Sequence, residues 1–325
     1  MSIKVVKPGL ATSIQDTGRE GFYHLGIPPS GALDQYSMKM ANLLVNNNEG
    51  DAVFECALLG PELIFECNSI VAVCGARMQP KLDGEPMPLD TAFSVKQGQT
   101  LSFNYPTAGA RAYLAISGGV DVPVTLGSRS TYTLGSLGGF KGRRLEAGDT
   151  IAIGTPVKPV IEGKSVPQTL LPSLAKEVSL RMIPGMYIHR LVDAAVEQFY
   201  EDTWTVGSEA DRIGYRFKDG HPMQFVEREQ PFGAGSDPSN IVDACYPIGS
   251  IQIPAGKEPI VLHRDAVSGG GYATIGTVIS ADLDLIGQMQ PNYKARFIPI
   301  TMEEALDARK VVQERLIKLK SYLQT

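Results

Sequence analysis

The stretch RAYLAISGG, residues 111–119, is a run of apolar residues that ends in two glycines. Short apolar runs bounded by turn residues are typical of buried β-strands. The runs ELIFE, residues 62–66, and SIVAVCG, residues 69–75, follow the same pattern, and turn residues break up most of the remaining chain. A doubly wound sheet would require strands that alternate with helices. The sequence therefore predicts a mainly β fold of sandwich or barrel type and disfavours a Rossmann-type fold.

Three segments have the apolar spacing of helices. They cover residues 34–45, residues 189–201 and the C-terminal segment that follows Thr301. Thr301 and Glu304 are three residues apart, which is the spacing of a capping box at a helix start. The run after them is amphipathic, so we expect a helix that packs on its own domain.

The chain has 325 residues, which is enough for two domains. Four prolines lie between residues 155 and 176, which is the composition of an interdomain connection. We predict an N-terminal β domain at residues 1–160, a proline-containing connection at 161–180 and a C-terminal β domain at 181–325 that ends in the amphipathic helix.

Composition excludes several classes of partner. The net charge is -5, and nucleic-acid binding depends on clustered Lys and Arg that this chain lacks. No apolar run reaches the ~18–20 residues that a membrane helix needs. The first residues, MSIKVVKPG, show no secretory signal, so we expect a cytoplasmic protein. Small molecules and proteins are the expected partners.

The four cysteines and four histidines show no metal-ligand spacing. There is no CxxC pair and no HExxH motif, so we predict no metal site and reduced, mostly buried thiols. Gly163-Lys164-Ser165 supplies only the tail of a phosphate-binding loop. No other nucleotide motif is recognisable.

The tripeptide Met38-Lys39-Met40 matches the way a biotin carrier presents its acceptor lysine. In such a carrier the lysine lies at the tip of a β-hairpin, whereas here the tripeptide lies inside a predicted helix. We therefore expect a surface lysine at position 39 and no covalent biotin on this chain.

Three polar, glycine-rich loops stand out as candidate sites. The first, residues 15–34, holds its polar side chains among glycines and a proline pair, so its backbone shape is heavily specified. The second, residues 117–139, contains Arg129, whose guanidinium can bind a carboxylate or a phosphate through two hydrogen bonds. The third, residues 263–282, has three glycines before Tyr272. For each loop alone, a tight turn with an internal salt bridge is an equally good interpretation.

Together these loops resemble the family called KipA, the C subunit of 5-oxoprolinase or allophanate hydrolase subunit 2, often described as biotin-dependent carboxyltransferases. Its members carry Q-D-x-G-R-x-G, P-x-S-G-A-M-D, G-G-x-D-V-P, L-G-S-R-S-T, S-D-R-M-G-Y-R and late G-G-Y and I-S-A-D motifs. The matching segments here are Gln15–Gly21, Ser30–Asp34, Gly118–Pro123, Leu126–Thr131, Asp211–Arg216, Gly270–Tyr272 and Ile279–Asp282. The matches run over nearly the full length.

Leu33 and Ile213 stand where the family has Met, and S-D-R is written Ser208-Glu-Ala-Asp-Arg212, but one other departure from the family pattern matters more. The usual D-x-Q-T-T-G-G-Y is written here as Asp265-Ala-Val-Ser-Gly-Gly-Gly-Tyr272, with Val for Gln and Ser-Gly for the two threonines. If this segment lines the substrate site, the specificity of this protein differs from that of its relatives.

The resemblance implies two tandem cyclophilin-like β-barrel domains with a few peripheral helices. For function it implies one subunit of an ATP-dependent amidohydrolase that converts 5-oxoproline, ATP and water to glutamate, ADP and phosphate. The implied partners are a KipI-like protein, which is the B subunit of 5-oxoprolinase, and a LamB-like protein, which is the A subunit, with activity only in the complex. ATP would then bind at the interface with the partner or on the partner.

Such chemistry needs cationic donors for developing charge and a carboxylate to manage protons. The candidate catalytic residues are the acids and arginines of the matched loops: Asp16, Arg19, Asp34, Arg129, Arg212 and Asp265. The candidate substrate-binding residues are the remaining polar groups of the same motifs: Ser30, Ser128, Ser130, Tyr215, Tyr272 and Asp282.

Two other functions stay open on this evidence. One is a carboxyltransferase component that acts on urea or another small amide with a separate biotin carrier. The other is a non-catalytic regulatory partner that antagonises a KipI-like kinase inhibitor. Charged residues in the three loops favour an enzyme, whereas an apolar exposed patch would favour pure binding.

Overall fold

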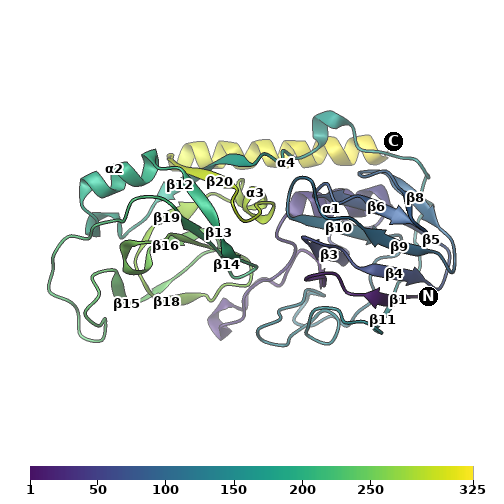
Figure 1. Cartoon of the computed structure of the whole chain (residues 1–325), viewed down its shortest axis with the longest axis horizontal. Coiled ribbons are helices and arrows are strands. Elements are labelled where there is room, and N and C mark those ends of the chain that lie inside the picture. The colour runs from purple at the N-terminus through teal and green to yellow at the C-terminus, as the bar shows by residue number, and fades with distance from the viewer. Residues whose placement is uncertain (325) are drawn as a thin grey trace. The chain divides into compact units, whose positions relative to one another are not determined.

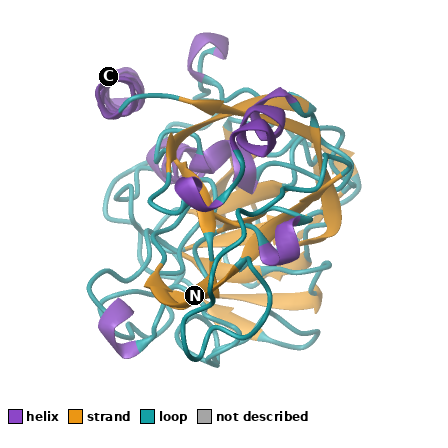
Figure 2. Cartoon of the chain, turned by 90° about the vertical axis from the view of Figure 1, so that its left-hand side faces the viewer, coloured by secondary structure: helices purple, strands orange, loops and turns teal. Residues whose placement is uncertain are grey.

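The computed structural model describes residues 1–324 and confirms a mainly β fold (Figure 2). The chain forms two compact units. The first unit contains residues 1–20, 29–174 and those from 314 onward; the second contains residues 21–28 and 175–313. The sequence-based division placed everything after residue 181 in one domain. In the structure, the last turns of the C-terminal helix belong instead with the N-terminal strands.

The first unit contains two antiparallel sheets (Figure 1). The six-stranded sheet has the order β11-β1-β4-β9-β6-β7, with β11 (Thr150–Ala152), β1 (Ser2–Lys7), β4 (Glu62–Phe65), β9 (Thr100–Phe103), β6 (Pro80–Leu82) and β7 (Glu85–Pro86). The five-stranded sheet has the order β2-β3-β10-β5-β8, with β2 (Ser13–Gln15), β3 (Val53–Ala57), β10 (Arg111–Ile116), β5 (Ser69–Gly75) and β8 (Ala92–Val95).

Strand β10, which contains the RAYLAI run, lies at the centre of the five-stranded sheet, and all six of its residues are buried. One face of the strand, which carries Leu114, belongs to a core that also contains Ile3 and Leu63 of the other sheet. The opposite face, which carries Tyr113, packs on the helix α1 (Gln35–Leu44). Because both faces are covered, the residues that follow Arg111 in the strand are apolar on both faces rather than alternating.

The resemblance implied a closed barrel in this half, but the hydrogen bonding leaves two sheets with open edges. The edge strands are short: β7 has two residues and β2 has three. Pro86 in β7 also has no N–H to donate to a further strand. Strand pairing therefore stops at these edges, and burial between the two sheets forms the core.

The second unit contains a closed seven-stranded barrel, as expected for this half. Its order is β12 (Glu177–Pro184), β19 (Thr274–Val278), β16 (Ser250–Gln252), β17 (Ile260–Leu262), β14 (Gly214–Lys218), β13 (Trp204–Ala210) and β20 (Lys294–Pro299). Strands β12 and β20 run parallel and close the ring, and the other pairs are antiparallel. A separate two-stranded ribbon joins β15 (Asn240–Cys245) to β18 (Gly269–Tyr272).

The helices largely follow the sequence prediction. Helix α1 begins after Asp34, and α2 (Asp193–Glu201) begins four residues later than expected. Helix α4 (Met302–Gln324) has the predicted capping box: the Thr301 N–H donates to Glu304 at 2.8 Å, and the Glu304 N–H donates to Thr301 Oγ1 at 3.2 Å. Short elements that periodicity could not predict are α3 (Leu283–Gly287), η1 (Tyr23–Leu25), η2 (Gln168–Leu170), η3 (Ile188–Arg190) and η4 (Pro254–Gly256). Within residues 1–324, no helix combines the length and the apolar character needed to cross a bilayer.

Candidate functional site

The carboxylate of Asp16 joins two of the three candidate loops. It is buried and accepts hydrogen bonds from the Gly18 N–H at 2.7 Å, the Ser128 hydroxyl at 2.7 Å, the Arg129 N–H at 2.5 Å and the Ser130 hydroxyl. Four donors occupy most of the acceptor positions of one carboxylate. Asp16 is therefore a link between the loops rather than an accessible base.

Arg19 and Ser30 are fixed in the same region of the first unit. The Arg19 N–H donates to the Pro29 carbonyl at 2.7 Å, and its buried guanidinium donates through Nη2 to the Ser130 carbonyl. Ser30 is buried with φ +56°. A Cβ on Gly18 would lie 2.8 Å from the carbonyl oxygens of Pro29 and Ser30. The two ends of the loop therefore touch only because residue 18 is glycine.

Arg129 differs from the other predicted residues of this unit because 35% of its side chain is exposed. Its Nε donates to the Val122 carbonyl at 2.8 Å, and its Nη2 donates to Asp121 at 3.2 Å. The six other predicted residues of the first unit are buried: Asp16, Arg19, Ser30, Asp34, Ser128 and Ser130. Of the seven, Arg129 is the one that presents a guanidinium to an incoming anion.

Asp34 is the N-cap of helix α1. Its carboxylate accepts the Ser37 N–H at 2.9 Å and the Ser37 hydroxyl at 2.6 Å. Its own N–H donates to the Tyr113 hydroxyl at 2.8 Å, and that hydroxyl donates to buried Glu55 at 2.9 Å. Burial, then the nearby carboxylates of Glu55 and Asp34, raises the pKa of Tyr113 well above its ordinary value. Sequence reasoning missed Glu55, although a lone glutamate inside the apolar run VFECA was a usable signal.

In the second unit, Arg212 and Asp265 form a two-point ion pair. Arg212 donates through Nε to Oδ2 at 2.8 Å and through Nη2 to Oδ1 at 3.1 Å. The Asp265 N–H also donates to the Arg212 carbonyl at 2.9 Å, so side chains and backbone fix one geometry. The Arg212 side chain is 15% exposed. Asp265 of the third loop thus orients the guanidinium of Arg212, which lies close to the surface.

Two of the predicted substrate-binding residues in this unit have internal roles. Tyr215 is buried, with its ring centroid 6.1 Å from that of buried His263. Buried Asp282 accepts from the Arg181 N–H at 2.8 Å, from its Nε at 3.0 Å and from its Nη2 at 2.6 Å. That carboxylate holds strand β12 and raises the pKa of Arg181, against the opposing effect of burial.

Tyr272 is the predicted residue most available for contact, with 42% of its surface exposed. It ends strand β18, inside the segment that departs from the family pattern. Its N–H donates to the buried Tyr246 hydroxyl at 2.8 Å, and the carbonyl oxygens of Tyr272 and Gly270, both 2.7 Å away, share the one proton of that hydroxyl. Burial raises the pKa of Tyr246. The Tyr246 hydroxyl therefore fixes the backbone of the β15–β18 ribbon, while Tyr272 itself stays partly exposed.

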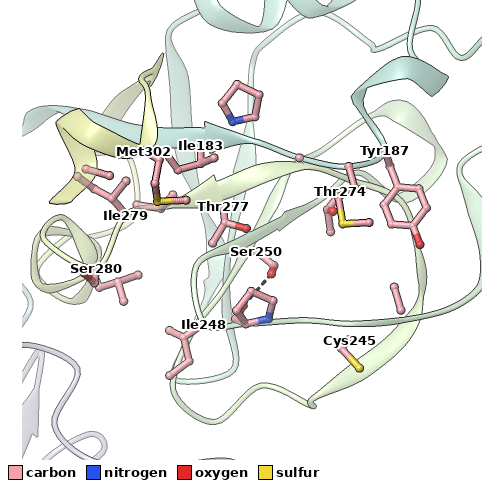
Figure 3. Close-up of a pocket in the computed structure, with 18 of the residues that line it drawn as sticks. Ile183, Tyr187, Cys245, Ile248, Ser250, Thr274, Thr277, Ile279, Ser280 and Met302 are labelled. Carbon is pink, nitrogen blue, oxygen red and sulfur yellow. Dashed lines mark hydrogen bonds between the residues drawn. The ribbon is translucent and has the colours of Figure 1, made fainter.

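A pocket of about 730 Å³ lies on the outside of the barrel in the second unit (Figure 3). Strands β12, β16 and β19 contribute Ile183, Ser250 and Thr277, and the start of α4 contributes Met302. None of the twelve predicted site residues lines it. Sequence reasoning missed it because its walls come from mostly apolar residues of strands, loops and a helix that are distant in the chain. Ser280, inside the ISAD motif, is the nearest signal.

No group of three or more His, Cys, Asp or Glu able to hold a metal ion occurs within residues 1–324. Cys56 and Cys74 are buried, Cys67 is half-buried and Cys245 is exposed. Burial raises the pKa of the Cys56 and Cys74 thiols. Lys39 lies within helix α1, not at a hairpin tip.

Comparisons with known proteins agree with these motifs. Residues 25–299 match the model of the carboxyltransferase domain, subdomains A and B. The chain is 35% identical to the urea amidolyase of Saccharomyces cerevisiae over 94% of its length but spans only 17% of that protein. It is 33% identical to the C subunit of 5-oxoprolinase from Escherichia coli, with 94% of each chain covered.

A solved structure gives the same result. The urea carboxylase of Kluyveromyces lactis superposes with a TM-score of 0.91 at 33% identity, covering 99% of this chain and 29% of that one. Most of the length of these large enzymes therefore has no counterpart here. The shared motifs, the family match and the near-complete overlap with a relative of similar length lead to one conclusion: this chain belongs to the carboxyltransferase domain family, subdomains A and B.

Proposed function

We propose that this protein is one subunit of an ATP-dependent amidohydrolase that opens 5-oxoproline to glutamate. The observation that carries the proposal is the alignment with the C subunit of 5-oxoprolinase, which covers 94% of both chains. Every large segment of that relative thus has a counterpart here. The urea amidolyase of S. cerevisiae, by contrast, keeps 83% of its length outside the match, since only 17% of it is covered.

The chemistry must overcome amide resonance in the lactam. Transfer of the γ-phosphoryl group of ATP to the lactam oxygen breaks its bond to ADP and makes the ring carbon electrophilic. One water adds to that carbon, and the C–N bond breaks to release the amine of glutamate. A second water displaces phosphate from the resulting acyl phosphate. Negative charge develops on oxygen in these steps, and positioned donors stabilise it.

Arg129 and Arg212 are the side chains that suit this role. Each is oriented by a carboxylate, Asp121 or Asp265, and each keeps part of its surface exposed. Asp16 and Asp34 are less suited to proton transfer. Asp16 already accepts four hydrogen bonds, and Asp34 caps a helix. Arg19 is buried and acts by positioning the loop. In this proposal Tyr272 provides a substrate contact from the ribbon.

The proposed complex includes a KipI-like protein and a LamB-like protein, with ATP bound at the interface with the partner or on the partner. Relatives named as the C subunit of 5-oxoprolinase support the presence of other subunits. The absence of a recognisable nucleotide motif in the sequence supports a nucleotide site that this chain does not form alone.

The test is reconstitution of the chain with a KipI-like and a LamB-like protein, followed by measurement of phosphate and glutamate release. We expect ATP hydrolysis that depends on 5-oxoproline, and a loss of about 100-fold or more in Arg212→Ala and Arg129→Ala. Lys310→Ala, an exposed change on α4, is the matched control. Full turnover in both arginine variants would remove the catalytic assignment. A stable complex without turnover would favour the regulatory function instead.

A second candidate is carboxyl transfer to urea or another small amide from a separate biotin carrier. The family model and the TM-score of 0.91 to a urea carboxylase favour it. The same reconstitution distinguishes the two candidates when a biotinylated carrier and biotin carboxylase replace the partner proteins. Urea-dependent consumption of carboxybiotin, without 5-oxoproline turnover, would support this candidate.

A further inference from the structure

We propose that the pocket on the outer face of the second unit's barrel binds a small monocarboxylate that carries an apolar chain and an internal amide, the chemistry of an N-acyl amino acid. This inference does not depend on the proposed function. The pocket shares no residue with the predicted catalytic and substrate-binding set.

The size of the pocket suits a small organic molecule. Its volume of about 730 Å³ lies within the ~300–1,000 Å³ typical of ligand sites. Urea or 5-oxoproline alone would leave most of that space unfilled. The ligand that this pocket fits is therefore larger than the substrates considered above.

The walls are apolar and adaptable. Ile183 from β12, together with Ile248 and Ile279 from neighbouring loops, lines the body of the pocket. Met186 and Met302 lie at its rim, with 87% and 57% of their surfaces exposed. Thioether side chains adjust to irregular apolar shapes, so this rim suits an acyl chain better than a rigid planar ring.

Hydroxyl groups interrupt these walls. In Figure 3, Thr277 and Ser250 lie in the middle of the lining, with Tyr187 and Cys245 to one side and Met302 to the other. The Ser250 hydroxyl donates to the Pro247 carbonyl at 2.7 Å. The side chains of Tyr187, Thr274 and Thr277 also bring hydroxyl groups to the lining. Both amide groups, N–H and C=O, can pair with such hydroxyls.

The charge of the lining indicates that the ligand carries a carboxylate. Arg309 is the single charged side chain in the lining, and it lies on the α4 face that also carries Met302, Ala305 and Leu306. Its guanidinium forms no ion pair with any acid of residues 1–324. An unopposed guanidinium at the edge of an apolar pocket favours a carboxylate, which it can bind through two hydrogen bonds.

The experiment uses the full chain and two probes, N-octanoylglycine and its uncharged analogue N-octanoylglycinamide, with titration calorimetry. We expect saturable binding of the acid, weakened about tenfold or more in Arg309→Gln, because that variant loses one charge-assisted contact. Binding of the glycinamide should be the same in wild type and Arg309→Gln. Lys310→Gln, the next residue along α4 and not part of the lining, is the matched control for lost positive charge.

A second variant tests the location. Ala305→Trp fills the pocket from the exposed helix side without altering a barrel strand, and it should abolish binding of both probes while the thermal transition stays unchanged. Thr277→Val should weaken the binding of both probes to the same extent, because it removes a hydroxyl from the pocket and keeps the shape of the side chain. The proposal is overturned if wild type shows no saturable binding of the acid, or if Arg309→Gln or Ala305→Trp binds it as wild type does.

Discussion

Asp16 and Ser130 bind each other in both directions across 114 residues of sequence. The Asp16 N–H donates to the Ser130 hydroxyl at 2.9 Å, and that hydroxyl donates back to the Asp16 carboxylate. The two most polar loops of the first unit are therefore joined by residues that the sequence marked as candidates for chemistry. Their hydrogen bonds show that they first serve to hold the loops in place.

The first prediction concerns Asp16 itself. Asp16→Ala should lower the free energy of unfolding by about 3 kcal/mol or more, because it leaves buried donors from Ser128, Ser130 and the Arg129 backbone without an acceptor. Urea denaturation followed by tyrosine fluorescence and circular dichroism measures this loss. Asp121→Ala, an exposed acid on the same loop, should change stability by less than about 1 kcal/mol. Equal stability of Asp16→Ala and wild type would show that the network contributes little.

The second prediction concerns the close approach at Gly18. Gly18→Ala should destabilise the first unit by more than Gly98→Ala, although both residues have similar positive φ angles, +98° and +88°. A Cβ at Gly98 meets nothing within 4 Å, so that variant measures only the backbone strain of about 1–2 kcal/mol. At Gly18 the Cβ also meets two carbonyl oxygens at 2.8 Å. Scanning calorimetry compares the two, and identical melting temperatures would contradict the crowding argument.

The third prediction separates the two roles open to Asp34. Asp34→Ala should cost about 1 kcal/mol of stability through loss of the α1 cap, while Asp34→Asn keeps an N-cap acceptor and should be close to wild type. If Asp34 only caps the helix, Asp34→Asn should also retain full turnover in the reconstituted complex. A stable Asp34→Asn variant without turnover would instead restore the catalytic assignment.

The fourth prediction concerns acid stability. Arg143 donates through both terminal nitrogens to Asp149, each at 2.8 Å, and this hydrogen bonding holds the pKa of Asp149 below its ordinary value of 3.8. A lowered folded-state pKa means that the pair stabilises the fold above about pH 4. That stabilisation is lost as the pH falls below 3.8 toward the folded-state value.

Asp149→Asn should therefore melt at a lower temperature than wild type at pH 7, by an amount equivalent to about 1 kcal/mol. The two melting temperatures should converge as the pH falls from 4 to 2. Asp83→Asn, which removes an exposed acid that also has a lowered pKa but no ion pair among the described residues, is the comparison variant. A gap between wild type and Asp149→Asn that stays constant across this pH range would rule out the linkage.

Local pattern was enough to predict much of the fold. The apolar runs at residues 62–66, 69–75 and 111–116 are strands, and the capping box at Thr301 begins the C-terminal helix. These features depend on residues that are neighbours in the chain. The spacing of such residues follows the periodicity of the helix or strand and therefore predicts it. The division of α4 between the two units did not follow from pattern, because a helix has the same periodicity whichever partner covers each turn.

The sequence by itself determined that the protein is mainly β, which loops are rigid and polar, and which family motifs they carry. Only the tertiary structure decided that Asp16, Asp34 and Asp282 use their carboxylates to bind internal donors while Arg129 and Tyr272 remain partly exposed. Only it brought together the walls of the barrel pocket. The physical reason is that hydrogen-bond partners and pocket walls come from residues far apart in sequence, and burial of a polar side chain is set by those distant contacts rather than by its neighbours.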